Sequence, residues 1–154
     1  MYIRSVEKRD CLDLWKWRND YKTILYSISK SFVSYPRHYK WFNNIIKKTD
    51  VEIFIAYDKK GKNKIGMVRF EKKARRAIEV SINMNPIFRG KGLGGQFLSA
   101  SISNFLKRAP GFVINARVLI DNYRSKRLFE SCGFAATSTR DKVVHYTLKK
   151  GKLA

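Results

Sequence analysis

The residues with the clearest chemical potential form a glycine-rich stretch between a predicted strand and a predicted helix. The stretch reads Arg89, Gly90, Lys91, Gly92, Leu93, Gly94 and Gly95. Glycines allow backbone dihedral angles that other residues avoid, and they let a ligand come close to the main chain. Free N–H groups at the start of the following helix, the helix dipole and two basic side chains suit a diphosphate. We therefore predict that this turn binds a diphosphate-bearing ligand.

The glycine spacing alone permits other interpretations. A P-loop needs Lys followed by Ser or Thr after its last glycine, whereas Gly95 is followed by Gln96. The dinucleotide-binding pattern is met by count. That pattern, however, follows the first strand of a β-α-β unit and has an acidic residue about 20 positions later. Here an antiparallel meander is expected before the turn, and residues 110–118 contain no acid. A surface turn without a ligand is the remaining alternative.

A second segment, residues 122–134, completes a resemblance to the GNAT superfamily of N-acetyltransferases. That superfamily carries Arg/Gln-x-x-Gly-x-Gly/Ala after its fourth strand, and Arg89, Gly92 and Gly94 match it. It also carries Asn-x-x-Ala/Ser-x-x-Leu-Tyr/Phe-x-x-x-Gly-Phe, which the second segment matches at every fixed position. The two motifs have the right order and spacing, and the resemblance covers nearly the whole chain. It implies acetyl-CoA as cosubstrate, an amine as acceptor and no metal.

The resemblance also implies where the coenzyme binds. The end of the fourth strand should pair through its backbone with the pantetheine arm, and an N–H group there should face the thioester oxygen. Asn122 should hydrogen-bond the pantetheine or orient a water, and it can also cap the following helix. The coenzyme-binding residues expected are Ile82, Met84, Arg89, Gly90, Lys91, Gly92, Leu93, Gly94, Gly95, Asn122 and Ser125.

Acetyl transfer needs a neutral amine, a polarised thioester carbonyl and a proton for the leaving thiolate. Related enzymes often place a carboxylate on the fourth strand, so Glu79 is the candidate general base; a structural ion pair is the alternative. Phe129 stands where many relatives carry a tyrosine that protonates the thiolate. Tyr123 is our candidate replacement, with Ser131, Tyr146 or solvent as alternatives. Direct attack in a ternary complex is the course that the resemblance implies.

The N-terminal third should form the acceptor side. Trp-Arg-Asn-Asp at 17–20 and His-x-x-Trp-Phe at 38–42 resemble the branch that acetylates nucleotide-linked amino sugars, of the pseudaminic-acid-pathway type. Core packing is the alternative for the tryptophans, and a surface position for the histidine. The candidate acceptor-binding residues are Arg18, Asn19 and Trp41, with His38 as a contact or proton acceptor near its usual pKa.

The net charge of +21 arises from 33 Lys and Arg residues against 12 Asp and Glu residues. Such a field repels a polyamine or a histone-like tail and attracts anions. A protein or another small-molecule amine stays open as acceptor. From other classes, the chain could bind acetyl-CoA without turnover, because of Phe129, or bind nucleic acid nonspecifically. We expect no specific nucleic acid partner, since no helix-turn-helix, zinc or RNA-recognition signature is present.

The two cysteines, Cys11 and Cys132, form no paired motif for a disulfide framework or a metal. The sequence shows neither a signal peptide core nor an apolar run long enough for a membrane span. A cytoplasmic protein is expected, and a homodimer is possible.

Hydrophobic periodicity indicates the elements that position these residues. Asp10 is expected to cap the first helix, and the glycine-rich turn to open the helix that follows it. We expect one domain over residues 1–154, an α/β (α+β) fold with a mixed, mostly antiparallel sheet, helices on both faces and a splay between strands 4 and 5. The predicted strands span residues 2–6, 51–57, 65–71, 77–84, 112–119, 134–139 and 143–148. The predicted helices span residues 11–17, 36–46, 92–108 and 122–132, with a short helical turn within 19–34.

Overall fold

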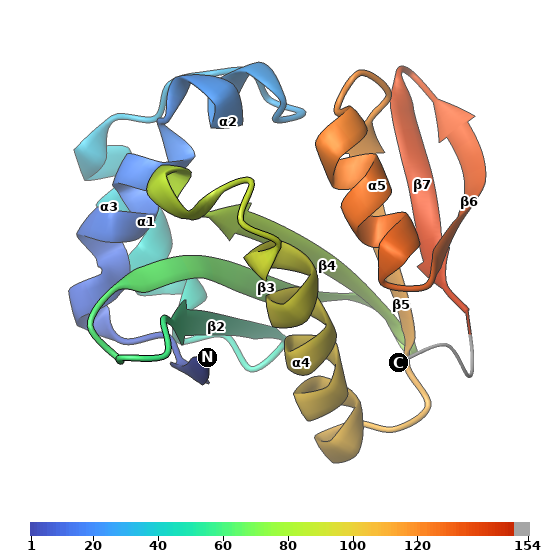
Figure 1. Cartoon of the computed structure of the whole chain (residues 1–154), viewed down its shortest axis with the longest axis horizontal. Coiled ribbons are helices and arrows are strands. Elements are labelled where there is room, and N and C mark those ends of the chain that lie inside the picture. Colours follow the sequence, from blue (N-terminus) through green and yellow to red (C-terminus); the bar gives the residue numbers. More distant parts are fainter. Residues whose placement is uncertain (150–154) are drawn as a thin grey trace.

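A seven-stranded mixed sheet forms the framework of the protein (Figure 1). The computed structural model describes residues 1–149. In space the strands follow the order β1-β2-β3-β4-β5-β7-β6, and all neighbours are antiparallel except β4 and β5. The mixed, mostly antiparallel sheet is as predicted. The strands are β1 (Tyr2–Ser5), β2 (Val51–Tyr57), β3 (Lys64–Ala74), β4 (Ala77–Met84), β5 (Val113–Leu119), β6 (Phe134–Arg140) and β7 (Val143–Leu148).

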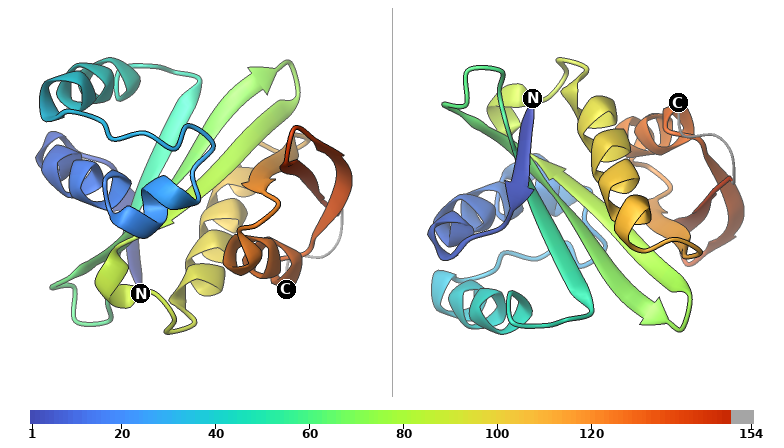
Figure 2. Two further views of the ribbon diagram at one scale, coloured as in Figure 1. Left: turned by 90° about the horizontal axis from the view of Figure 1, so that it is seen from above. Right: turned by 90° about the horizontal axis from the view of Figure 1, so that it is seen from below.

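Helices lie on both sides of this sheet, as Figure 2 shows. One side carries α1 (Cys11–Arg18), α2 (Tyr21–Leu25) and α3 (Tyr35–Ile45), and the other carries α4 (Leu93–Arg108) and α5 (Tyr123–Ser131). Two short 3-10 turns, η1 (Lys8–Asp10) and η2 (Pro86–Phe88), precede α1 and the glycine-rich turn. None of the helices between residues 1 and 149 combines the length and apolarity needed to cross a bilayer.

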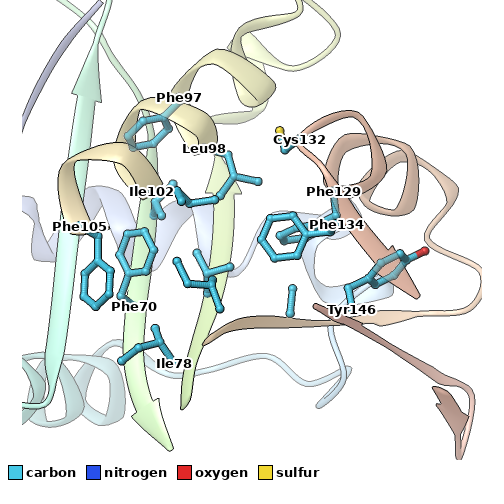
Figure 3. Packing of buried hydrophobic residues seen from close by; sticks show 14 of the residues in the cluster. Phe70, Ile78, Phe97, Leu98, Ile102, Phe105, Phe129, Cys132, Phe134 and Tyr146 are labelled. Carbon is cyan, nitrogen blue, oxygen red and sulfur yellow. The ribbon is translucent and has the colours of Figure 1, made fainter. Parts of the chain in front are cut away.

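The larger core lies between the sheet and the α4–α5 side (Figure 3). Alternate residues of a strand point to opposite faces, so Phe70 of β3 faces α4, where its ring stacks on Phe105 at 4.7 Å between centroids. Phe129 of α5 packs edge-on against Phe134 of β6 at 5.1 Å. A smaller core between the sheet and α1–α3 includes Trp17. The larger core holds β4 from the α4–α5 side through Ile78, Val80, Ile82 and Met84.

A buried ion-pair network ties β1, β3 and the start of α1 together. Asp10 is fully buried, and its carboxylate accepts hydrogen bonds from Arg4 at 2.7 and 2.8 Å and from the Glu7 backbone N–H at 2.7 Å. Lys64 Nζ lies 2.8 Å from Asp10 Oδ1. Burial alone would raise the pKa of Asp10, but the bonds from Arg4 and Lys64 outweigh it and lower the pKa to about 2. Asp10 is the N-cap residue of α1, as predicted, but its engaged side chain makes no cap hydrogen bond to the helix.

We predict that Asp10→Asn lowers the free energy of unfolding by about 3 kcal/mol, because two cations lose a buried counter-charge. Asp13→Asn is the matched control: Asp13 also contacts Lys64, at 2.6 Å, but its side chain is 39% exposed. Exposed pairs contribute about 0–1 kcal/mol, so the control should change little. Urea unfolding measures both, and equal effects would contradict the prediction.

The stabilisation by Asp10 should also depend on pH. The pKa of Asp10 is lower in the folded protein than in the unfolded chain, so the stabilisation is present above the unfolded value, near 4. It is lost as the pH falls from about 4 towards about 2, where wild type and Asp10→Asn should converge in stability.

Candidate functional site

The parallel pair β4–β5 opens into a V. Within residues 1–149 the ladder joins only 77–79 of β4 to 113–115 of β5, and its last pair is Glu79 with Asn115. Figure 1 shows the two strands meeting at one end and diverging towards α2. Backbone N–H and C=O groups beyond the last pair need partners that β5 does not supply. The predicted splay is therefore present, and it leaves the edge of β4 around Ile82 and Met84 available to an extended ligand.

The glycine-rich turn lies where the free end of β4 leads into α4. Gly90 and Gly92 have φ angles of +75° and +72°, in the left-handed region that glycine tolerates best. No heavy atom would lie within 4 Å of a Cβ at either position. Gly92 is the N-cap of the 16-residue helix α4, so the first-turn N–H groups of Leu93, Gly94 and Gly95 lack intrahelical partners. This arrangement fits a diphosphate, as predicted from the sequence.

Gly94 also lies where the first turn of α4 packs closely against α5. A Cβ built on Gly94 would lie 2.7 Å from Leu128 Cδ1 of α5. Absence of a side chain there lets α5 approach the first turn of α4. The second predicted motif is thereby brought against the first, on the same side of the sheet.

The two basic residues of the turn differ in their surroundings. Lys91 is exposed, and its Nζ lies 5.0 Å from the centroid of the Phe88 ring. Arg89 instead forms an ion pair with Asp20, at the start of α2, and donates to Met84 O at 3.1 Å. We expected both side chains to supply charge to a diphosphate; in this structure the guanidinium of Arg89 is engaged by protein groups.

The N-terminus of α5 carries the second group of predicted coenzyme residues. Asn122 Oδ1 accepts from Ser125 N at 3.2 Å, so Asn122 caps α5. Tyr123 is 65% exposed, and Lys126 Nζ lies 5.1 Å from the centroid of its ring. Phe129 is buried in the core. Asn122, Ser125 and Tyr123 thus lie together at the start of one helix, whereas Phe129 does not reach the surface.

Two alternative proton donors are occupied by protein partners. The Tyr146 hydroxyl donates to Glu130 at 2.9 Å, and burial together with Glu130 raises the pKa of Tyr146 to about 12. The Ser131 hydroxyl donates to Leu128 O at 2.8 Å. Neither hydroxyl is therefore free to supply a proton, and Tyr123 is the exposed hydroxyl of the three for which the structure gives no protein acceptor among residues 1–149.

Glu79 lies on the open face of the sheet, in a polar groove of about 600 Å³. Its carboxylate accepts from Arg117 of β5 at 2.7 and 3.0 Å, and this bond raises the pKa of Arg117. Glu71 of β3 lies directly opposite Glu79 in the ladder. Polar and apolar side chains complete the groove: Lys73, Ile78, Asn115, Thr137, Ser138, His145, Tyr146 and Thr147. The ion pair that the sequence left as an alternative is present, inside a cavity that an acceptor can enter.

The predicted acceptor residues do not share one surface. Asn19 holds the backbone of Val33 through two hydrogen bonds of 2.8 Å. His38 is 4% exposed, its Nε2 lies 3.0 Å from Cys11 O, and burial lowers its pKa. Its position between α1 and α3 is that of a core histidine, so a role as acceptor contact or base is not supported.

Arg18 and Trp41 are half-buried. Arg18 Nη2 donates to Ser29 Oγ at 2.6 Å, while Nη1 is buried without an acceptor among the described residues. The Arg69 guanidinium lies 6.0 Å from the centroid of the Trp41 ring, and Trp41 also packs on the smaller core. Of the predicted acceptor residues, Arg18 is the one with a buried polar atom that has no partner among the described residues.

Sequence reasoning missed Arg117, Asn115 and the partner of Arg89. A signal existed for the first two: strand alternation over residues 113–119 places Asn115 and Arg117 on the face opposite the apolar residues. Asp20 and Arg89 are separated by 69 positions, and no local pattern predicts their contact.

Comparison with known proteins agrees with this geometry. A family model described as "Acetyltransferase (GNAT) domain" matches residues 1–135. An uncharacterized protein of Methanocaldococcus jannaschii is 29% identical over 139 residues, which make up 88% of this chain but only 28% of that protein.

Solved structures show the same fold. A domain from Methanocaldococcus jannaschii superposes with a TM-score of 0.81 at 24% identity, covering 96% of each chain. Spermidine N-acetyltransferase from Vibrio cholerae, in complex with CoA and spermine, superposes with a TM-score of 0.84 at 19% identity, covering 99% of this chain and 96% of that one. The family match spans most of the sequence and includes the V-shaped strand pair and the glycine-rich turn, so the chain belongs to the GNAT acetyltransferase domain family.

Proposed function

We propose that this protein is an acetyl-CoA-dependent N-acetyltransferase whose acceptor is a small primary amine, the amino group of a nucleotide-linked amino sugar. The observation that supports acetyl-CoA as the acetyl donor is the V between β4 and β5, at whose open end lies the left-handed glycine turn. The acceptor half is supported by the polar groove beside Glu79.

The coenzyme would lie along the V with its diphosphate on the glycine turn. The first-turn N–H groups of α4 and the exposed Lys91 supply donors and charge for the diphosphate. The free edge of β4, around Ile82 and Met84, supplies backbone groups for the pantetheine arm. Asn122 uses Oδ1 for the helix cap, which leaves its Nδ2 for the same arm. The thioester supplies the activated acetyl group, and a β4 N–H stabilises negative charge on its oxygen.

Glu79 would accept the proton of the attacking ammonium, directly or through water, and Arg117 would hold the carboxylate in the groove. The neutral amine then attacks the thioester carbon and the C–N bond forms. The positively charged nitrogen of the resulting intermediate loses its second proton to water, and the C–S bond breaks. The thiolate leaves and takes a proton from Tyr123 or from solvent. No covalent intermediate on the protein is required.

The groove lining suits a hydroxylated acceptor. Hydroxyl and amide groups from Asn115, Thr137, Ser138 and Thr147 can bind the ring of a sugar. The two cations of the lining are already paired with carboxylates, Arg117 with Glu79 and Lys73 with Glu71. The preference for an anionic acceptor over a polyamine is therefore supported by the net charge of +21 and not by the groove itself.

We predict that the protein with acetyl-CoA releases free thiol in the presence of nucleotide-linked amino sugars, and much less with spermine. The physical reason is the net charge of +21, which attracts an anionic acceptor and repels a polycation. A thiol-reactive dye measures the release. Turnover on spermine or on a peptide panel, with none on the sugars, would contradict the acceptor assignment; absence of acetyl-CoA binding would contradict the donor assignment.

Replacement of Glu79 tests the base. We expect Glu79→Gln to lower kcat/KM by about 100-fold, because an amide cannot accept the proton of the amine. Glu71→Gln is the matched control and should leave kcat/KM near the wild-type value, because Glu71 lies opposite Glu79 on the neighbouring strand and is paired with Lys73 at 2.8 Å. A wild-type kcat/KM in Glu79→Gln would show that Glu79 is not the base.

The proton donor is tested by two conservative replacements. Tyr123→Phe should lower kcat about 100-fold with little change in either KM, because only the proton for the thiolate is lost. Tyr146→Phe should leave kcat near the wild-type value, since that hydroxyl is bound to Glu130. If neither variant slows turnover, solvent protonates the thiolate.

A further inference from the structure

Arg89 is the first residue of the glycine turn, yet its guanidinium is bound to protein groups on the acceptor side of the V. Nη1 pairs with Asp20 Oδ2, and Nη2 donates to Thr23 Oγ1 at 2.7 Å and to Met84 O at 3.1 Å. The side chains of Arg89 and Asp20 are 20% and 24% exposed. One side chain thus joins the end of β4, the start of the turn and the first turn of α2.

Asp20 is held in place independently of Arg89. It is the N-cap of α2, and its Oδ2 accepts from Thr23 N at 3.2 Å. Burial would raise the pKa of Asp20, but the bonds from Arg89 and Thr23 lower it, so the carboxylate stays charged at neutral pH. Asp20 is therefore a fixed anchor for the arginine.

The segment around Asp20 is also fixed on its other side. Trp15 Nε1 donates to Val33 O at 2.7 Å, and Asn19 binds both backbone groups of Val33. Trp15 and Asn19, the latter a residue that the sequence suggested for acceptor binding, thus hold the two ends of segment 19–33 together. This segment rests against the coenzyme turn through the Asp20–Arg89 pair.

We infer that Asp20 is a positioning residue for coenzyme binding. It holds Arg89 against Met84, and so fixes the direction in which the chain enters the left-handed glycine turn. The guanidinium of Arg89 links α2 to the end of β4 and does not bind the diphosphate. The inference rests on the proposed function, because it concerns the turn that receives the coenzyme.

The two possible roles of Arg89 predict opposite signs for one substitution. If Arg89 bound the diphosphate directly, removal of the negative charge of Asp20 would free the guanidinium and strengthen coenzyme binding. If Asp20 positions the turn through Arg89, the same removal weakens coenzyme binding although a negative charge near the diphosphate has gone.

The test is calorimetric titration of the whole protein with CoA. Asp20→Asn and Arg89→Gln should each raise the Kd for CoA about tenfold, and the double variant should be no weaker than Arg89→Gln alone. Thr23→Val, which removes one bond to Arg89, should have a smaller effect of the same sign. Glu52→Gln is the matched control, because it breaks an exposed pair with Arg108 (2.7 Å) outside this site and should leave the Kd unchanged.

A second ligand separates positioning from a general loss of structure. Pantetheine lacks the diphosphate, so its affinity should be the same in wild type and Asp20→Asn. Equal weakening of CoA and pantetheine, or CoA binding in Asp20→Asn as tight as in wild type or tighter, overturns the inference. If Asp20→Asn does not fold, Thr23→Val and Asp20→Glu carry the same comparison, and a Thr23→Val variant with wild-type affinity overturns it.

The outcomes for the proposed function are distinct. Binding of CoA with the expected pattern, but no acetyl transfer to any amine, would refute the enzyme and support the role of Asp20. Acetyl transfer by the wild type, together with an unchanged Kd for CoA in Asp20→Asn, would support the enzyme and refute the role of Asp20. A wild-type protein that does not bind CoA would refute both.

Discussion

Backbone hydrogen bonding between β4 and β5 ends after three residue pairs. The candidate site exists because the backbone groups of β4 beyond these pairs have no partner in β5. A strand in the middle of a sheet normally satisfies its N–H and C=O groups on both sides. Here β4 has a complete partner in β3, which holds it straight, while its other edge is released beyond Glu79. The released edge is held by the ladder with β3 and by the packing of alternate β4 residues in the larger core, so its free N–H and C=O groups have set positions. The glycine turn at the end of the same strand extends this row of backbone groups into the first turn of α4.

One face of the sheet carries the main hydrophobic core, and the other carries the polar residues of the candidate site. On the α4–α5 side, alternate residues of β3 to β7 bury aromatic and branched side chains in one core. On the opposite side, the same strands present Glu71, Glu79, Asn115 and Arg117, and α1 to α3 cover only part of that face. The groove lies on the part of this face that α1 to α3 leave uncovered. Because strand alternation sets both faces at once, a register shift of one residue would bury the charges and expose the core.

The fold and the conformation of the glycine turn could be predicted from local sequence, whereas the contacts of the residues proposed for the acceptor could not. Strands 51–57, 77–84 and 143–148 have their predicted bounds because their apolar and β-branched residues leave little choice. The glycine turn is also a local signal. His38 was expected at the acceptor but lies in the core. A histidine near an aromatic pair has the same sequence pattern whether it faces a ligand or the core. The contact of Asp20 with Arg89, and the pairing of Glu79 with Arg117, depend on how the sheet brings distant segments together.

Gly94 meets two physical demands that have different origins. It belongs to the row of backbone donors at the start of α4, and it lies so close to α5 that a single added carbon would be 2.7 Å from Leu128. A methyl group at position 94 would therefore require the Leu128 side chain to change its conformation, whether or not a ligand is bound. A glycine at such a position reports on how closely two helices pack as much as on what the protein binds.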